Sequence, residues 1–119
     1  MVIARDALDK LLDLIGGDTG SLAELIESFL DESPLLLDQL QQAAGAGDRM
    51  GLGRAAHTLK SSARDFGAVQ LSSSCEMLEK ECREGMPERA AAKVETIFAE
   101  CTLARNELTA CLAELRKGA

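Results

Sequence analysis

Apolar residues recur every three or four positions in five stretches of this 119-residue chain, and Gly or Pro lies between most neighbouring stretches. That spacing places the apolar side chains of each stretch along one face of a helix. The apolar residues are mostly Leu and Ala, which favour helices, whereas β-branched residues, which favour strands, are few. The pattern therefore predicts an all-α fold.

The breaks between the stretches define five expected helices, which cover about residues 5–15, 19–44, 48–66, 68–84 and 87–116. The apolar stripes include Leu25 in the second helix and Phe98 in the fifth, so both side chains are expected in the core. Pro87 is expected in the first turn of the fifth helix. Ser33 and Pro34 interrupt the second helix. Because proline removes an internal hydrogen bond, they predict either one kinked helix or two abutting helices.

Connections of about two to five residues join these helices, and such short connections force neighbouring helices to run antiparallel. We therefore expect one domain over residues 1–119. Its architecture should be an up-down antiparallel four-helix bundle with an additional short N-terminal helix packed across it. Bundles of this kind host many functions, so the fold by itself indicates none of them.

The net charge of the chain is −7, which excludes several kinds of partner. Such a surface repels nucleic acids and anionic membranes, so neither is expected to bind. No apolar run is long enough to span a bilayer, and the N-terminus does not resemble a signal peptide. The expected compartment is the cytoplasm, and the expected state is a monomer.

Four cysteines occur in the chain, and none of them forms a C-x-x-C pair. They are Cys75, Cys82, Cys101 and Cys111. Zinc and redox sites use closely spaced Cys and His ligands, and the single His of this chain lies far from the cysteines in sequence. We therefore expect no metal site, and we expect reduced thiols that pack as small hydrophobic side chains.

The single histidine, His57, lies on the polar face of the third expected helix. On this helix Lys60, Ser61 and Arg64 follow it at three, four and seven positions, and Gly53 and Arg54 precede it by about one turn. The opposite face carries the apolar residues Leu52, Ala55, Ala56, Leu59, Ala63 and Phe66. His57 is therefore expected to be exposed.

The charge of this helix differs from that of the rest of the chain. Between Arg49 and Arg64 there are four basic residues and no acidic one, in a chain with 20 acidic and 13 basic residues. A basic strip beside His57 suits a dianionic group bound to that residue, which Lys60 and Arg64 could stabilise. A neutral imidazole is a nucleophile near pH 7. The alternative is an exposed histidine without a role on a solvated basic face.

The run His57-Thr58-Leu59-Lys60-Ser61-Ser62-Ala63, followed by Gly67-Ala68, resembles the signature of histidine-containing phosphotransfer (HPt) domains. That signature has Leu, Lys, a small residue, Ser and Gly at two, three, four, five and ten positions after the His. Ala46-Gly47-Asp48, Ser33-Pro34 and Leu78-Glu79 are also similar to features of the family. The resemblance covers about residues 20 to 85 well.

The resemblance implies a role for each matching residue. His57 would accept and donate the phosphoryl group, and Lys60 would neutralise the phosphoryl oxygens. Ser61 occupies the position at which the family usually has Gly. A receiver domain would dock over Gly53, Arg54 and Ser61. Glu79 would face the histidine helix and hydrogen-bond the second ring nitrogen, although an exposed Glu without this contact is the alternative.

The resemblance also implies a function and a set of partners. The chain would carry phosphoryl groups between receiver-domain aspartates in two-component signalling, and a hybrid sensor histidine kinase is a further candidate partner. No cofactor is expected on this chain, because the Mg²⁺ belongs to the receiver. The sequence has no nucleotide-binding motif, so an enzyme that phosphorylates itself from ATP is not expected. The alternatives are the phospho-accepting domain of a chemotaxis-type histidine kinase and a helical adaptor that works without phosphate.

Overall fold

The computed structural model describes residues 3–118, and of Arg5 only the backbone. Five α-helices make up most of this part of the chain: α1 (Arg5–Leu14), α2 (Thr19–Ala46), α3 (Arg49–Asp65), α4 (Val69–Glu84) and α5 (Ala90–Lys117). Within residues 3–118 the only β-type pairing is an isolated bridge between Ile3 and Ala68. The prediction of an all-α fold is confirmed.

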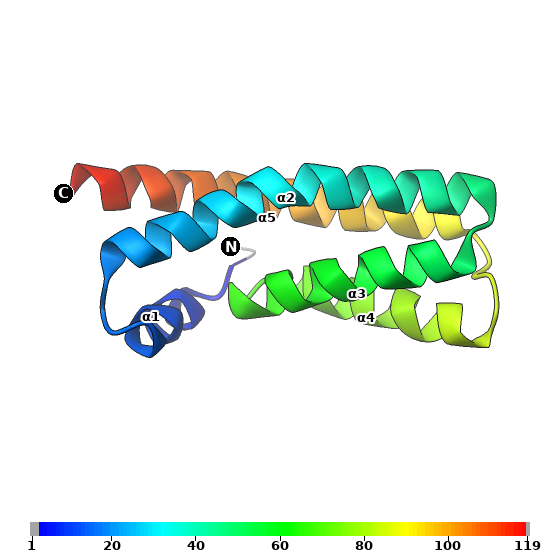
Figure 1. The fold of residues 1–119 in the computed structure, drawn as a ribbon, viewed down its shortest axis with the longest axis horizontal. Helices are drawn as coiled ribbons and strands as arrows, with labels where there is room; N and C mark the ends of the chain where they lie inside the picture. Colours follow the sequence, from blue (N-terminus) through cyan, green and yellow to red (C-terminus); the bar gives the residue numbers. More distant parts are fainter. Residues whose placement is uncertain (1–2, 119) are drawn as a thin grey trace.

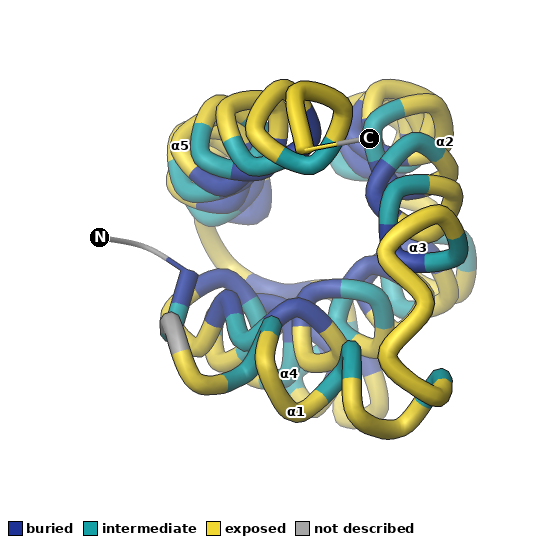
Figure 2. Tube along the Cα trace, turned by 90° about the vertical axis from the view of Figure 1, so that its left-hand side faces the viewer, coloured by how far each residue is buried: buried dark blue, intermediate teal, exposed yellow. Residues whose placement is uncertain are grey.

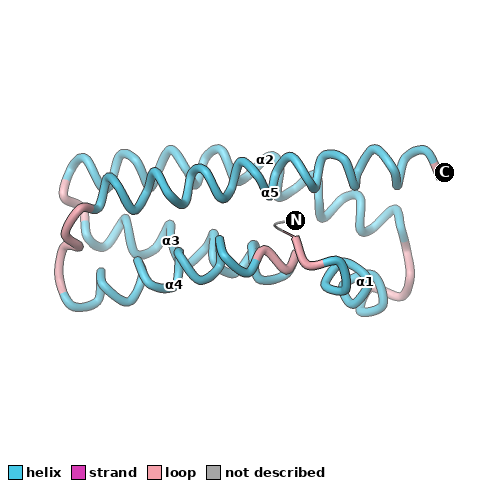
Figure 3. The backbone as a smooth tube through the Cα atoms, turned by 180° about the vertical axis from the view of Figure 1, so that it is seen from behind, coloured by secondary structure: helices cyan, strands magenta, loops and turns pink. Residues whose placement is uncertain are grey.

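The five helices form an elongated bundle of 47 × 21 × 20 Å. The long helices α2 and α5, of 28 residues each, lie side by side along the molecule (Figure 1). α3 and α4 form a hairpin that covers one half of this pair, and α1 crosses the other half (Figures 1 and 3). The expected up-down bundle with a short additional N-terminal helix is therefore confirmed.

The core lies on the inner faces of the helices, as the dark blue segments of Figure 2 show. Two residues of the predicted apolar stripes do not belong to it: Leu25 and Phe98 are 40% and 41% exposed. Leu25 lines a surface groove with Leu11 of α1 and with Phe66 at the end of α3, so the neighbouring helices cover it only in part. Phe98 directly follows the buried Ile97, so its side chain points about 100° away from the core-facing direction.

The Ser33-Pro34 break does not divide α2, which is one continuous helix that changes direction in its first half (Figure 1). Pro34 has no N–H to donate to the carbonyl of Leu30, one turn earlier. The Arg105 guanidinium of α5 donates to this carbonyl at 2.6 Å and also to the hydroxyl of Ser33, which is fully buried. The second proline, Pro87, lies outside α5, because this helix begins only at Ala90.

Both ends of α3 are fixed by local contacts. At its start the Asp48 carboxylate accepts a hydrogen bond from the Gly51 N–H, at 2.9 Å. At its end Gly67 has a φ of +71°, and the N–H groups of Gly67 and Ala68 donate to carbonyls of the last turn. A Cβ on Gly67 would lie 2.3 Å from the Cβ of Ala7, so this glycine also lets α1 pack closely. The helix that carries His57 is thus held at a defined length and position.

Candidate functional site

His57 lies near the middle of α3, and its side chain is 58% exposed. The apolar face of α3 packs into the core through Leu52, Ala55, Ala56, Leu59 and Ala63, all of which are buried. Because this face is fixed against the other helices, the opposite face must point outward, and His57 lies on it. The imidazole is therefore accessible to a partner while its backbone is rigid.

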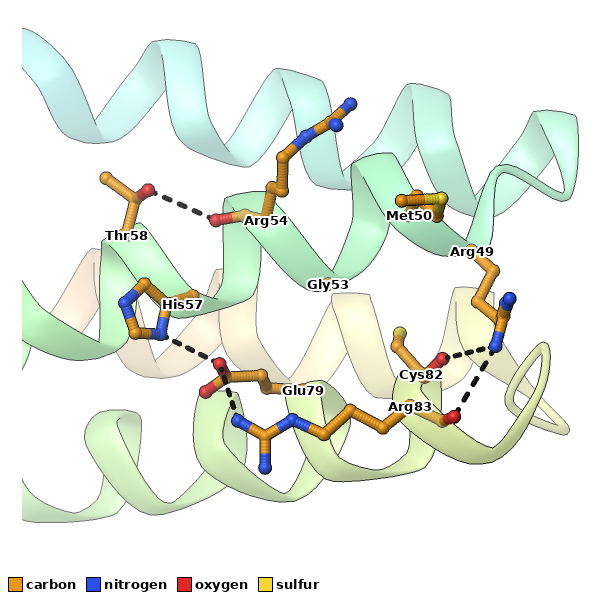
Figure 4. Close-up of a pocket in the computed structure, with 9 residues that line it drawn as sticks. All are labelled: Arg49, Met50, Gly53, Arg54, His57, Thr58, Glu79, Cys82 and Arg83. Atoms are coloured by element: carbon orange, nitrogen blue, oxygen red, sulfur yellow. Dashed lines mark hydrogen bonds and ion pairs between the residues drawn. The ribbon is translucent and has the colours of Figure 1, made fainter.

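Glu79 of α4 holds the inner nitrogen of the His57 ring. Its Oε2 lies 2.8 Å from His57 Nδ1, and the residue is buried although it is charged (Figure 4). Lys60 Nζ lies 2.6 Å from Oε1 of the same carboxylate, and Arg83 Nη2 lies 3.2 Å from Oε2. One carboxylate therefore binds three side chains, two from α3 and one from α4.

The charge state of Glu79 follows from these contacts. The hydrogen bond from Lys60 is the main cause that lowers the pKa of Glu79, and the hydrogen bond from His57 adds to it, against an opposing effect of burial. The group is then ionised near neutral pH and can only accept hydrogen bonds. Nδ1 must therefore carry the proton of a neutral His57 ring, which leaves the lone pair of Nε2 free for attack.

The sequence predicted that the side chain of Lys60 lies on an exposed polar stripe, and this prediction is wrong. The side chain is only 12% exposed, because the ammonium group turns toward Glu79 between α3 and α4. The helical spacing places Lys60 one turn from His57. It gives no information on where Glu79, a residue of another helix, lies relative to Lys60. Lys60 is thus beside the histidine, and in this structure its charge is bound to a carboxylate.

The other α3 residues expected at the site lie near His57 and form no hydrogen bond with its ring. Arg54, Ser61 and Arg64 are exposed, and neither arginine forms an ion pair with a carboxylate of the described residues. Ser61 Oγ donates to the His57 carbonyl at 3.2 Å, within the helix. Two unpaired cations and one small polar residue are therefore available to a partner on this face.

The close packing of α3 against α4 favours a glycine at position 53, and the sequence did not reveal this preference. A Cβ at this position would lie 3.2 Å from the Cβ of Cys82, so the glycine allows α3 and α4 to approach each other. We expected it to leave room for a partner next to His57, but its first effect is on helix packing. The close approach of the two helices is also what brings Glu79 within reach of His57.

An open groove of about 600 Å³ adjoins His57 on the side of the α3 N-terminus (Figure 4). It is lined by Arg49, Met50, Gly53, Arg54, His57, Thr58, Glu79, Cys82 and Arg83. Sequence reasoning gave no role at the site to Met50 and Arg83. Signals for both exist in the sequence, because Met50 precedes His57 by seven residues and Arg83 follows Glu79 by four, which are helical spacings.

The remaining side chains of the described part offer little metal chemistry. No group of three or more His, Cys, Asp or Glu residues within 3–118 is arranged to hold a metal ion. Cys75, Cys82 and Cys101 are buried, and burial raises the pKa of Cys75 to about 12, which keeps its thiol protonated. None of the helices described is both long and apolar enough to cross a membrane.

Comparisons with known proteins agree with this geometry. The family model of the Hpt domain matches residues 24–118. The crystal structure of histidine-containing phosphotransfer protein B (HptB) from Pseudomonas aeruginosa PAO1 superposes with a TM-score of 0.86 at 26% identity, over 95% of this chain and 96% of that chain. No curated protein sequence matches the chain.

A second solved structure shares the fold. It is the HPT domain from the Hpt sensor hybrid histidine kinase of Shewanella, with a TM-score of 0.73 at 18% identity, over 90% of this chain and 92% of that chain. The arrangement of α2 to α5 is therefore one that phosphotransfer domains are known to adopt.

Proposed function

Because this chain belongs to the Hpt domain family, whose members are phosphotransfer modules of phosphorelays that work with receiver domains, we propose that Nε2 of His57 is the atom that carries the phosphoryl group. The observation that supports this atom is the contact between Glu79 and Nδ1, at 2.8 Å. This contact supports a proton on the inner nitrogen, Nδ1, and therefore supports the other nitrogen, Nε2, as the nucleophile.

The transfer needs one bond to form and one to break. The lone pair of Nε2 attacks the phosphorus of an aspartyl phosphate on a receiver domain, and the bond between phosphorus and the aspartate oxygen breaks. The carboxylate leaves as an anion, while the Nδ1 proton stays on the ring. The ring gains positive charge in this step, so its hydrogen bond to the ionised Glu79 becomes stronger. Transfer to the next receiver reverses these events.

The positive side chains around His57 would neutralise the transferred group. Lys60 can reach it if its ammonium moves from Glu79 toward Nε2, because the two residues lie one turn apart on α3. Arg64 follows by one more turn and is exposed. Phosphoryl transfer depends mainly on positioning and on charge neutralisation. A scaffold that places an imidazole between fixed charges is therefore sufficient, with the remaining groups supplied by the receiver.

We propose that the phosphoryl donor is a receiver domain and not ATP, and that the Mg²⁺ of the reaction belongs to the receiver. The family's modules are distinct from kinases, and this chain has no nucleotide-binding motif. A direct comparison tests the donor: incubation with a histidine kinase core and ATP against incubation with a phosphorylated receiver. Labelling by the kinase core alone would instead favour a chemotaxis-type phospho-accepting domain.

The surface charge supports further parts of the proposal. A net charge of −7 disfavours nucleic acid and anionic membranes as partners. We also propose a cytoplasmic protein, which suits its free cysteines, and one that works as a monomer. Light scattering of the purified chain tests the monomer. A dimer at micromolar concentration would contradict it.

The replacement of His57 by Gln tests the central assignment. The side chain is 58% exposed and packs little, so His57→Gln should fold with a melting temperature within a few degrees of the wild type. It should take up no acid-labile phosphate from a phosphorylated receiver. Lys80→Gln, on the exposed side of α4, is the matched control and should take up phosphate normally. Uptake by His57→Gln at the wild-type level would show that another residue is the acceptor.

A further inference from the structure

We propose that the groove beside His57 is the specificity pocket for the receiver domain, and that it binds an apolar receiver side chain flanked by acidic residues. This inference rests on the proposed function, because it takes the receiver as the partner of His57. We call the site the Met50 groove, defined by Met50, Gly53, Cys82 and the three arginines Arg49, Arg54 and Arg83.

The floor of the Met50 groove is apolar. Met50 is 65% exposed, and it lies two turns before His57 on the same face of α3, about 10 Å along the helix axis. Gly53 lies between them and lets Cys82 of α4 approach, as the 3.2 Å distance to its Cβ shows. A volume of about 600 Å³ is enough for one or two large side chains of a partner.

The rim of the groove is positively charged, and two of its three arginines are held in place. Arg49 donates to the carbonyls of Cys82 and Arg83, at 3.2 and 3.5 Å, so α4 fixes its position. Arg83 is paired with Glu79, and Arg54 has no ion pair with a described carboxylate. With Glu79 as the only acid of the lining, three positive charges and one negative charge leave +2 at neutral His57.

The charge distribution on the two sides of His57 indicates where the partner's acids lie. At the C-terminal end of α3, another groove is lined by four apolar residues, by Ser28 and Ser62, and by Glu32 and Asp65, and its lining contains no basic residue. An acidic partner surface would be attracted more strongly by the Met50 groove, which three arginines line, than by the other end of α3, where the exposed Arg64 lies next to Asp65. The groove is also continuous with His57, so a receiver that brings its aspartate to Nε2 must lie over this region.

A methionine suits a site that has to accept more than one partner. A relay module receives a phosphoryl group from one receiver and delivers it to another, so the same face must fit two related surfaces. The unbranched methionine side chain adapts to different shapes at little energetic cost. Met50 is therefore the residue that we expect both receivers to contact, whereas the arginines select for acidic residues around that contact.

The replacement of Met50 by Gln tests this proposal, with Leu35→Gln as the matched control. Leu35 is 66% exposed, close to the value of Met50, and it lies on α2 outside the groove. The assay measures transfer from purified phosphorylated receiver domains, each normalised to the reaction of His57 with phosphoramidate, which needs no docking. Met50→Gln should raise the KM for each receiver by about tenfold with a smaller change in kcat, and Leu35→Gln should change neither.

Charge reversal tests the rim. Arg54→Glu should raise the KM for receivers further than Met50→Gln does, and it should flatten the dependence of KM on salt concentration. Equal KM values for Met50→Gln, Arg54→Glu and Leu35→Gln would overturn the proposal while leaving His57 as the acceptor. Absence of phosphate at His57 with both phosphoramidate and receivers would instead contradict the proposed function, so the two failures are distinguishable.

Discussion

Glu79 connects the chemistry of His57 to the packing of α3 against α4. Its carboxylate accepts hydrogen bonds from the His57 ring and from Lys60 on one helix, and from Arg83 on its own. The exposed ring is thereby held in one tautomer by a buried group. Lys60 is bound to the same carboxylate, so an ammonium one helical turn from His57 is kept at the site before the phosphoryl group arrives.

We predict that Lys60→Met strongly reduces the rate of phosphoryl transfer and has a smaller effect on the free energy of unfolding. Met keeps most of the aliphatic stem, which is largely buried, and it removes the charge together with the hydrogen bond to Glu79, which keeps its contacts with His57 and Arg83. The loss of one electrostatic donor should reduce the transfer rate by about tenfold to a thousandfold. Rapid-quench kinetics with a purified receiver measure this rate, and Lys80→Met serves as the control on the exposed side of α4. Wild-type kinetics for Lys60→Met would exclude the role of Lys60.

The lowered pKa of Glu79 predicts how the stability of the fold depends on pH. Its pKa in the folded protein lies below the ordinary value of 4.5, so between the two pKa values the unfolded chain binds more protons than the folded one. The stabilisation by Glu79 is therefore fully present above about pH 4.5 and is lost as the pH falls through the lower, folded value.

The variant Glu79→Gln tests whether the stabilisation by Glu79 is lost as the pH falls. At pH 7 the variant should be less stable by ~1–2 kcal/mol, because a neutral amide replaces the charged acceptor of three donors. The difference from the wild type should shrink as the pH falls below 4.5, since Glu79 itself becomes neutral. Urea titrations at several pH values measure the difference, and all other carboxylates are common to both proteins. A difference that stays constant from pH 7 to pH 3 would contradict the assignment.

At the scale of the helix, a side chain of α5 supplies the hydrogen bond that α2 lacks at its proline. Pro34 leaves the carbonyl of Leu30 without its usual donor inside the helix, and the Arg105 guanidinium supplies one from the neighbouring helix. The same guanidinium binds the buried hydroxyl of Ser33. The bend of α2 therefore serves as a fixed contact between the two longest helices.

A double-mutant cycle tests this contact. Arg105→Met should destabilise the wild type by ~1–3 kcal/mol, because the Leu30 carbonyl and the Ser33 hydroxyl lose a charged donor. In a Pro34→Ala background the new N–H of residue 34 can bond to Leu30, so the cost of Arg105→Met should become smaller. Equal costs in the two backgrounds, measured by urea unfolding, would show that Arg105 does not act through the carbonyl that proline leaves free.

At the scale of the molecule, periodicity in the sequence was enough to predict the five helices and the exposure of His57, and the short connections were enough to predict the antiparallel order of the helices. Periodicity describes the faces of one helix, so it places residues such as Leu59 and Ala63 in the core. Periodicity does not predict which face of one helix packs against which face of another. For this reason the contact of Glu79 with His57, 22 positions apart, came only from a family resemblance, and the burial of Lys60 was not predicted.

The exposed stripe residues illustrate the same limit of one-helix reasoning. Leu25 and Phe98 have the right spacing for a core residue, but the width of the interface with neighbouring helices decides whether they are covered. Leu25 lines a surface groove where the short α1 and the end of α3 meet α2, and these elements cover it only in part. The length of each helix and the place where the hairpin ends are properties of the whole fold.

The whole molecule also determines how a receiver can approach, and Ser61 tests this. A typical interface covers about 800 Å² on each partner, so a receiver centred on His57 extends at least one turn along α3 in both directions. Ser61 lies one turn after His57 and is exposed, and among the described residues its hydroxyl bonds only to the His57 carbonyl. Ser61→Phe should therefore block receiver docking and leave the melting temperature nearly unchanged.

Two further variants complete the Ser61 experiment. Ser61→Gly should keep or improve transfer, because it removes atoms from the docking face, at a cost of up to about 1 kcal/mol in helix stability. Ser73→Phe adds the same ring to an exposed position of α4, and it should leave transfer unchanged. Receiver affinity, transfer rate and melting temperature are measured for all three. Normal docking by Ser61→Phe would mean that the receiver reaches Nε2 without covering the second half of α3, and the interface would then lie wholly on the side of the Met50 groove.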